Sequence, residues 1–209
     1  MTQIKICGLT RIEDINAVNR FMPDYIGFVF AKSLRQVTRE QACFLKSKLN
    51  SNIKAVGIFI NEPVSSILNL IEGGVIDIVQ LHGDENEAYI IELKQKTACP
   101  VIKAIRVQSA EQIIKAERLP CDMLLLDSYQ KRQYGGSGKS FDLSLIPPLK
   151  KPYFLAGGLN DENIEQFILK CKPFGVDISS GVETDGIKDE NKIRQITETI
   201  SNINKEKKG

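Results

Sequence analysis

Histidine is almost absent from this chain: His82 is the single one among 209 residues. A metal site built from several histidines is therefore excluded, and we expect no bound metal. The five cysteines are odd in number and widely spaced, without any Cys-x-x-Cys pair. This pattern indicates neither a disulfide framework nor a cysteine-based zinc site.

Long apolar runs and an excess of charge are also missing. No run approaches the roughly 20 apolar residues that span a bilayer, and the N-terminus lacks a signal-peptide pattern. The formal net charge is only +2, which is too small to indicate nucleic acid or an anionic membrane as a partner. We therefore expect a cytoplasmic protein that contacts neither.

A repeated unit occupies the whole chain: a short apolar run, a glycine or polar corner, then a segment with helical periodicity. Such alternation implies a parallel sheet, and near-continuous apolar runs are typical of strands covered on both faces. Eight units predict an α/β fold, a single (β/α)8 TIM barrel over residues 1–209 with a polar tail at 204–209. The predicted strands are 3–7, 25–30, 54–60, 76–81, 100–105, 122–127, 152–157 and 174–179.

A doubly wound open sheet is the alternative fold. It would need less even spacing, and no G-x-G-x-x-G follows the first strand. Several helix starts carry capping signals. Thr10, Thr38 and Ser109 are each followed three residues later by Glu or Gln, the spacing of a capping box. Asn61 and Asn160 precede a proline or acidic residues, as N-caps often do.

Two glycine-bearing loops follow the seventh and eighth predicted strands. Gly157 and Gly158 lie in the first, and Ser180 and Gly181 in the second. In many barrels these loops bind phosphate, because glycine lets backbone N–H groups reach an anion. Either loop alone could be only a tight turn, but both together favour a phosphate site.

Cys7 and Asp127 stand at the ends of the first and sixth predicted strands. A thiolate can accept a proton, and a carboxyl group in a partly dry pocket can retain one to donate. Together they could act as base and acid on a small substrate. The alternative for Cys7 is a buried small hydrophobe, and the alternative for Asp127 is a turn residue.

Other candidate residues lie in neighbouring loops. Arg35 has a guanidinium that suits a carboxylate or phosphate, although it could also be a solvated surface residue. His82 is predicted to contact the substrate without a catalytic role. The stretch GGSGKS (135–140) lacks P-loop spacing, so we interpret it as a mobile loop over the site.

These motifs, taken in order, resemble the phosphoribosylanthranilate isomerase family of tryptophan biosynthesis. The stretches that carry the resemblance are KICGLT (5–10), GFVFAKSLR (27–35), VGIFIN (56–61), VQLHGDE (79–85), LLLD (124–127), GGSGKSFD (135–142), LAGGLNDENI (155–164), SSGVE (179–183) and GIKD (186–189). One departure is Leu34, where the family often has proline; its absence could loosen the loop that aims Arg35.

The resemblance implies an Amadori rearrangement of N-(5-phosphoribosyl)anthranilate without a cofactor. It implies that Cys7 removes the C2 proton, that Asp127 protonates the ribose ring oxygen, and that Arg35 contacts the anthranilate carboxylate. The substrate phosphate would lie on the loops of Gly157, Gly158, Ser180 and Gly181, and the protein would be a monomer or homodimer. Another phosphosugar barrel isomerase, or a non-catalytic phosphate-ligand binding barrel, are the alternatives; a binder has no use for the Cys7 and Asp127 pair.

Overall fold

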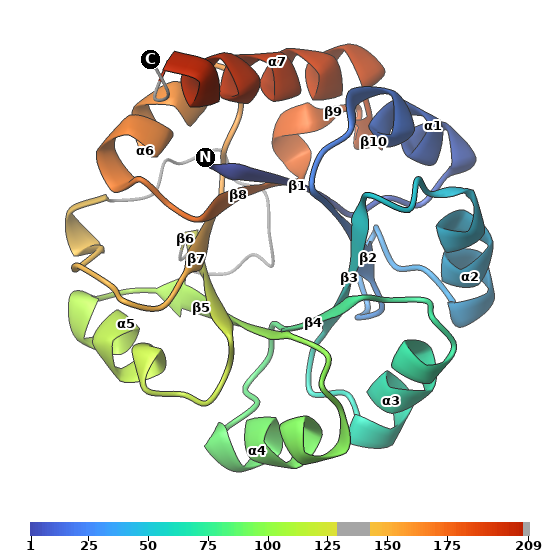
Figure 1. Cartoon of the computed structure of the whole chain (residues 1–209), viewed down its shortest axis with the longest axis vertical. Coiled ribbons are helices and arrows are strands. Elements are labelled where there is room, and N and C mark those ends of the chain that lie inside the picture. The colour runs from blue at the N-terminus through green and yellow to red at the C-terminus, as the bar shows by residue number, and fades with distance from the viewer. Residues whose placement is uncertain (129–142, 207–209) are drawn as a thin grey trace.

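A closed ring of eight parallel strands forms the centre of the computed structural model, which describes residues 1–128 and 143–206. This confirms the (β/α)8 barrel and excludes the open sheet (Figure 1). The interpretation of residues 135–140 as a loop over the site lies outside the described residues. The strands are β1 (Gln3–Cys7), β2 (Tyr25–Val29), β3 (Lys54–Phe59), β4 (Ile78–Leu81), β5 (Val101–Val107), β6 (Met123–Ser128), β7 (Tyr153–Ala156) and β8 (Gly175–Ile178).

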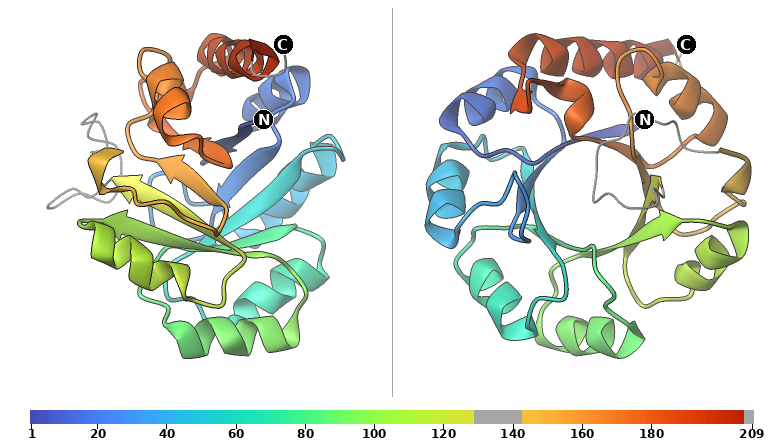
Figure 2. Two further views of the ribbon diagram at one scale, coloured as in Figure 1. Left: turned by 60° about the vertical axis from the view of Figure 1, so that its left-hand side comes forward. Right: turned by 180° about the vertical axis from the view of Figure 1, so that it is seen from behind.

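The helices form an outer ring around the strands, and α7 lies beside α1 and α6 (Figures 1 and 2). The α-helices are α1 (Ile12–Phe21), α2 (Arg39–Lys48), α3 (Val64–Glu72), α4 (Glu87–Lys96), α5 (Ala110–Glu117), α6 (Ile164–Cys171) and α7 (Glu190–Glu206). Two 3-10 helices, η1 (Leu143–Leu145) and η2 (Ser180–Val182), and a hairpin of β9 (Glu183–Thr184) and β10 (Ile187–Lys188) complete the described elements.

The capping predictions are partly confirmed. Thr38 and Ser109 cap α2 and α5, since each side chain accepts a backbone N–H bond from the residue three positions later. The prediction for Thr10 is wrong: its backbone N–H donates to the carboxylate of Asp14, and α1 begins later, at Ile12. Asn61 is not an N-cap either, because its side chain instead accepts the N–H of Asp84 in the loop after β4.

Two apolar layers hold the barrel together. The larger packs the outer faces of the strands against the helices, and the smaller fills the barrel interior. Side chains alternate along a strand, so residues two positions apart share a face. The buried members of the interior layer are Cys7, Val56, Ile58, Ile78, Ile102, Ala104, Leu125, Phe154 and Ala156.

The prediction of a polar tail is wrong for residues 204–206. Helix α7 continues to Glu206, and Asn204 is buried. Its side chain accepts the N–H of Thr2 at 2.7 Å and donates to the carbonyl of Thr2 at 2.9 Å. These two bonds fix α7 to the start of β1. The Asn204 side chain thereby provides the hydrogen-bond partners that the buried N–H and carbonyl of Thr2 would otherwise find in water.

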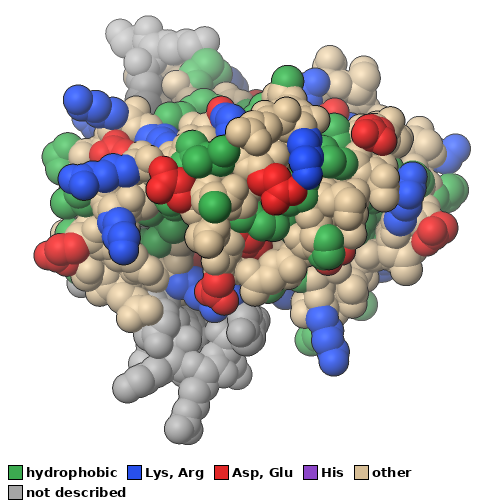
Figure 3. Space-filling model, turned by 90° about the horizontal axis from the view of Figure 1, so that it is seen from below, with side chains coloured by type: hydrophobic (Ala, Val, Ile, Leu, Met, Phe, Trp, Pro, Cys, Tyr) green, Lys and Arg blue, Asp and Glu red, His purple; other side chains and the backbone are tan. Residues whose placement is uncertain are grey.

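The charged side chains are distributed without one dominant sign on the face shown in Figure 3, where basic and acidic groups alternate. Within residues 1–128 and 143–206, none of the helices combines the length and the apolar character needed to cross a membrane.

Candidate active site

Strand alternation brings the predicted acid and base to one end of the barrel. Leu125 belongs to the interior layer, so Asp127, two residues further along β6, lies on the same face at the strand's carboxyl end. Cys7 ends β1 and is also in the interior layer. Because all eight strands are parallel, these two carboxyl ends lie on the same rim, where barrel enzymes have their active sites.

The thiol of Cys7 lies in a closely packed and charged environment. A β-carbon at Gly27, its register neighbour on β2, would lie only 2.7 Å from the Cys7 sulfur, so glycine there makes room for the thiol. Below it, Lys5 shares the same face of β1, and its Nζ lies 2.9 Å from Oδ2 of Asp177 on β8. The parallel register pairs Lys5 directly with Asp177.

Burial is the largest influence on the Cys7 thiol and raises its pKa above the ordinary value. The ammonium groups of Lys5 and Lys188 lower that pKa, while the carboxylate of Asp177 raises it further. Without substrate, the thiol is therefore protonated near neutral pH. Once ionised, a poorly solvated thiolate is a stronger base than one in water, because its conjugate acid is weaker.

Asp127 contacts the single histidine of the chain. Nε2 of His82, just after β4, lies 3.4 Å from Oδ2 of Asp127. The buried amide Nε2 of Gln80 lies 3.0 Å from His82 Nδ1. If the amide donates to Nδ1, the remaining ring proton is on Nε2 and points to Asp127. His82 thus lies beside the predicted acid.

A buried ion pair holds the loop that carries His82. Nζ of Lys103 on β5 lies 2.9 Å from Oε2 of Glu85 and donates to the carbonyl of Gly83 at 2.6 Å. The Glu85 carboxylate also accepts the N–H of Asn61 at 2.8 Å and that of Gly83 at 3.0 Å. Burial raises the pKa of Glu85, but Lys103 and the backbone N–H bonds that the carboxylate accepts together outweigh burial and hold this pKa below its ordinary value.

Arg35 lies in the loop between β2 and α2 and is paired rather than solvated. Its Nε and Nη2 donate to the two carboxylate oxygens of Glu183, at 2.7 and 2.6 Å. Leu34, which stands where the family often has proline, is fully exposed. Glu183 therefore holds the Arg35 guanidinium through both of its carboxylate oxygens in a chain that has leucine at position 34.

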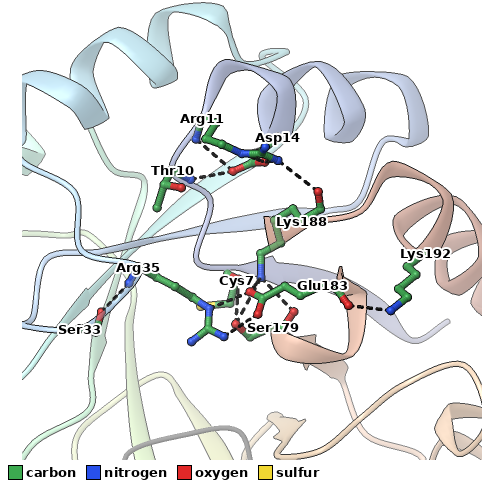
Figure 4. Close-up of polar contacts among 10 residues, drawn as sticks. All are labelled: Cys7, Thr10, Arg11, Asp14, Ser33, Arg35, Ser179, Glu183, Lys188 and Lys192. Carbon is green, nitrogen blue, oxygen red and sulfur yellow. Dashed lines mark hydrogen bonds and ion pairs between the residues drawn. The ribbon is translucent and has the colours of Figure 1, made fainter. Parts of the chain in front are cut away.

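Glu183 also binds Lys188, its direct partner in the β9–β10 hairpin. The Lys188 Nζ donates to Glu183 Oε1 at 2.5 Å and to the carbonyl of Ser179 at 2.9 Å. The Ser179 hydroxyl in turn donates to the carbonyl of Cys7 at 3.1 Å. Figure 4 shows Arg35 and Lys188 converging on Glu183 beside Cys7.

The two predicted phosphate loops contact each other. Gly157 and Gly158 have φ of +95° and +68°, values that favour glycine. A β-carbon at Gly181 would lie 1.8 Å from the carbonyl oxygen of Leu159, so only glycine allows this approach. Gly181 and Ser180 belong to η2, and the side-chain amide of Asn163 donates to the Gly158 carbonyl at 2.9 Å. The two loops are therefore in direct backbone contact at the rim.

Besides Lys103 and Glu85, the sequence analysis missed four charged residues near Cys7: Lys5, Asp177, Glu183 and Lys188. A signal was available for the first pair, because a lysine and an aspartate in the middle of buried strands need partners. For the second pair the signal was the Asp-Gly step between two short β segments, which is typical of a two-residue hairpin turn. Nothing in the sequence indicated that Arg35 joins the second pair.

The comparisons with known proteins agree with this geometry. The sequence model of the family "PRAI: N-(5'phosphoribosyl)anthranilate (PRA) isomerase" matches residues 4–199. The chain belongs to the N-(5'-phosphoribosyl)anthranilate isomerase family. One relative, the N-(5'-phosphoribosyl)anthranilate isomerase of Lachnoclostridium phytofermentans, is 45% identical over 204 residues, 91% of this chain and 94% of the relative.

Solved structures of N-(5'-phosphoribosyl)anthranilate isomerases share the fold over nearly the whole chain. The crystal structure of the Thermotoga maritima enzyme superposes with a TM-score of 0.88 at 36% identity, covering 97% of this chain and 100% of that one. Another is a complex with reduced 1-(o-carboxyphenylamino)-1-deoxyribulose 5-phosphate, with a TM-score of 0.83 at 31% identity and the same coverage. Within the described part of this chain, no three His, Cys, Asp or Glu side chains gather as a metal-binding group.

Proposed function

We propose that this chain converts N-(5-phosphoribosyl)anthranilate into 1-(2-carboxyphenylamino)-1-deoxyribulose 5-phosphate, with Cys7 as general base and Asp127 as general acid. The observation that carries the proposal is the position of these two side chains on one rim of a barrel that belongs to the isomerase family. Neither residue is needed there for packing alone, because Ala or Val could end β1 and Asn could turn the chain after β6.

Cys7 and Asp127 carry out the first two proton transfers, and tautomerisation of the enol completes the reaction. Asp127 donates a proton to the ribose ring oxygen, the bond from that oxygen to C1 breaks, and the nitrogen lone pair forms a C1=N iminium. The iminium withdraws electrons from C2, so the thiolate of Cys7 can remove the C2 proton. The C2–H electron pair becomes the C1=C2 bond and neutralises the iminium, and the resulting enol tautomerises to the aminoketose.

The remaining site residues bind the two charged ends of the substrate. Arg35 pairs with the anthranilate carboxylate, for which a guanidinium is well shaped. Backbone N–H groups of Gly157, Gly158, Ser180 and Gly181 hold the phosphate, supported by the contact between the two loops. His82 contacts the substrate from beside Asp127. No cofactor takes part in this scheme.

The test is turnover of freshly made N-(5-phosphoribosyl)anthranilate, followed through the loss of its anthranilate-type fluorescence. Turnover by the wild-type chain supports an enzyme. A protein that binds the reduced product but shows no turnover would be the non-catalytic binding barrel, and one that acts on a different aminoaldose phosphate instead would be another phosphosugar isomerase.

The cellular setting is part of the same proposal. A cytoplasmic location fits an enzyme whose substrate is a labile, charged small molecule, and fractionation of the source cells tests it. The assembly is a monomer or homodimer with no nucleic-acid or membrane partner. Light scattering after size-exclusion chromatography distinguishes the two forms, and a mass above that of two chains would contradict both.

A further inference from the structure

The contact between Arg35 and Glu183 uses only one edge of the guanidinium. Nε and Nη2 donate to the two oxygens of Glu183. A guanidinium has five N–H donors in a rigid fork. The opposite edge, formed by Nη1 and the second hydrogen of Nη2, has no partner among the described residues. A second carboxylate can therefore bind this edge while Glu183 keeps the first.

Burial places Glu183 behind Arg35 as seen from solvent. The side chain of Glu183 is 6% exposed, whereas that of Arg35 is 30% exposed. If Glu183 competed with the substrate carboxylate for the same edge of Arg35, it would have to release the guanidinium when the substrate binds. Glu183 instead occupies the inner edge of the fork, so it fixes the plane and direction of the outer edge.

Lys188 holds Glu183 from the other side. Its side chain is only 2% exposed, and its Nζ binds both Glu183 Oε1 and the carbonyl of Ser179. The turn of Asp185 and Gly186, with φ of +52° and +77°, fixes the hairpin that pairs Lys188 with Glu183. Two cations face this one carboxylate, so the cluster keeps a positive charge for an incoming anion.

We propose that Glu183, clamped by Lys188, is a positioning residue that orients the free edge of Arg35 toward the carboxylate of the substrate. The inference rests on the proposed function, since it takes the ligand of Arg35 to be the anthranilate carboxylate. It adds a specificity-determining element from the β9–β10 hairpin, which is distant in sequence from the β2 loop that carries Arg35.

The test measures binding of two ligands to wild type and Glu183→Gln. One ligand is reduced 1-(o-carboxyphenylamino)-1-deoxyribulose 5-phosphate, and the other is the matching phenylamino compound without the carboxyl group. Glu183→Gln should bind the first ligand about tenfold more weakly, because hydrogen bonds between charged groups are lost and Arg35 is free to rotate. Its affinity for the second ligand should change by less than about twofold.

A double-mutant cycle with Arg35→Met separates positioning from a general effect on the fold. In the Arg35→Met background, adding Glu183→Gln should not weaken the carboxylate ligand further. Glu190→Gln is the matched control, because Glu190 pairs with Arg20 on the exposed surface. That variant should bind both ligands as wild type does. If thermal melting shows that Glu183→Gln is unfolded, Glu183→Asp replaces it, since the shorter side chain keeps the charge but cannot reach both partners.

Several outcomes would overturn the inference. Tighter binding of the carboxylate ligand by Glu183→Gln would make Glu183 a competitor of the substrate. Equal weakening of both ligands would make its role structural, and an unchanged affinity would remove it from the site. In each case wild-type turnover of N-(5-phosphoribosyl)anthranilate would leave the proposed function standing. A wild-type chain that shows no turnover and binds neither ligand would overturn both proposals.

Discussion

Nζ of Lys5 lies 2.9 Å from Oδ2 of Asp177 in the barrel interior, two residues before Cys7 on the same face of β1. Both side chains are buried, and Asp177 Oδ1 has no hydrogen-bond partner among the described residues. A buried ion pair is costly to form. Of the two partners, Lys5 is the one that favours the anionic form of Cys7, whereas Asp177 opposes it.

Lys5→Met should move the pH dependence of the reaction. Cys7 acts as a base only when deprotonated, so kcat/KM falls as the pH drops below the pKa of its thiol. Lys5 lowers that pKa, together with Lys188, against burial and Asp177. Without Lys5 the pKa rises further, and the acid limb of the kcat/KM profile should move to higher pH. Initial rates measured across the pH range give the limb position.

A second variant separates this electrostatic effect from lost stability. Lys5→Met alone strands a buried carboxylate, which typically costs about 3–5 kcal/mol in the free energy of unfolding. Lys5→Met with Asp177→Asn should recover much of that stability while keeping a smaller shift of the acid limb, because Lys5 influences Cys7 more than Asp177 does. A limb that stays at the wild-type pH in both folded variants would show that Lys5 has only a structural role.

Cys7→Ser and Asp127→Asn should each reduce kcat by about 10²–10⁴-fold, the usual contribution of a general acid or base. Serine keeps the size of cysteine but is a far weaker acid, so it rarely provides the anion. Asparagine has no proton to donate to the ring oxygen. Steady-state kinetics on folded proteins, with circular dichroism to confirm the fold, measures both effects.

Two matched controls accompany these variants. Cys121→Ser alters another buried cysteine, and Asp122→Asn alters the aspartate just before the opposite end of β6. Both should keep wild-type kcat. Near-wild-type kcat in Cys7→Ser or Asp127→Asn would remove that residue from its role, and the same result in both would favour the binding-protein alternative.

Gly181→Ala should raise KM for the phosphorylated substrate by about tenfold or more, with a smaller effect on kcat. The new β-carbon would lie 1.8 Å from the Leu159 carbonyl oxygen, so the two phosphate loops must separate and charge-assisted contacts to phosphate are weakened. Gly74→Ala is the control: its φ is +64°, but no atom lies within 4 Å of the added carbon. Initial rates give KM, and added inorganic phosphate gives an inhibition constant. If both values in Gly181→Ala equal those of wild type, as expected for the control, the substrate phosphate lies elsewhere.

Glu85→Gln should destabilise the protein at neutral pH by about 3–5 kcal/mol, because it leaves buried Lys103 without its charged partner. The pKa of Glu85 is lowered in the folded state. Its stabilising contribution is therefore present above its unfolded pKa of about 4.3 and is lost as the pH falls through the folded value. The melting temperatures of wild type and Glu85→Gln, measured from pH 7 downward, should therefore converge in that acidic range. A difference in melting temperature that stays constant with pH would contradict a charged Glu85–Lys103 pair.

Much of the fold could be predicted because its signals are local. Each strand of the barrel appears as an apolar run, and Thr38 and Ser109 are caps that act within one turn. Thr10 was assigned incorrectly because a second acceptor, Asp14, lies only four residues away and is buried against Arg11. Sequence spacing does not decide whether Glu13 or Asp14 accepts the backbone N–H of Thr10; the burial of Asp14 does.

The sequence by itself determined the barrel, the strand ends that carry Cys7 and Asp127, and the glycine corners after β7 and β8, because these follow from periodicity and from glycine's backbone freedom. Only the tertiary structure decided which charges meet. Lys5 reaches Asp177 because barrel closure pairs β1 with β8. Arg35 reaches Glu183 across 148 positions of sequence because β1 lies between β2 and β8 in the closed ring, which brings the loops after these two strands close together. Ion pairs depend on distances between side chains on different elements, and those distances exist only once the ring has closed.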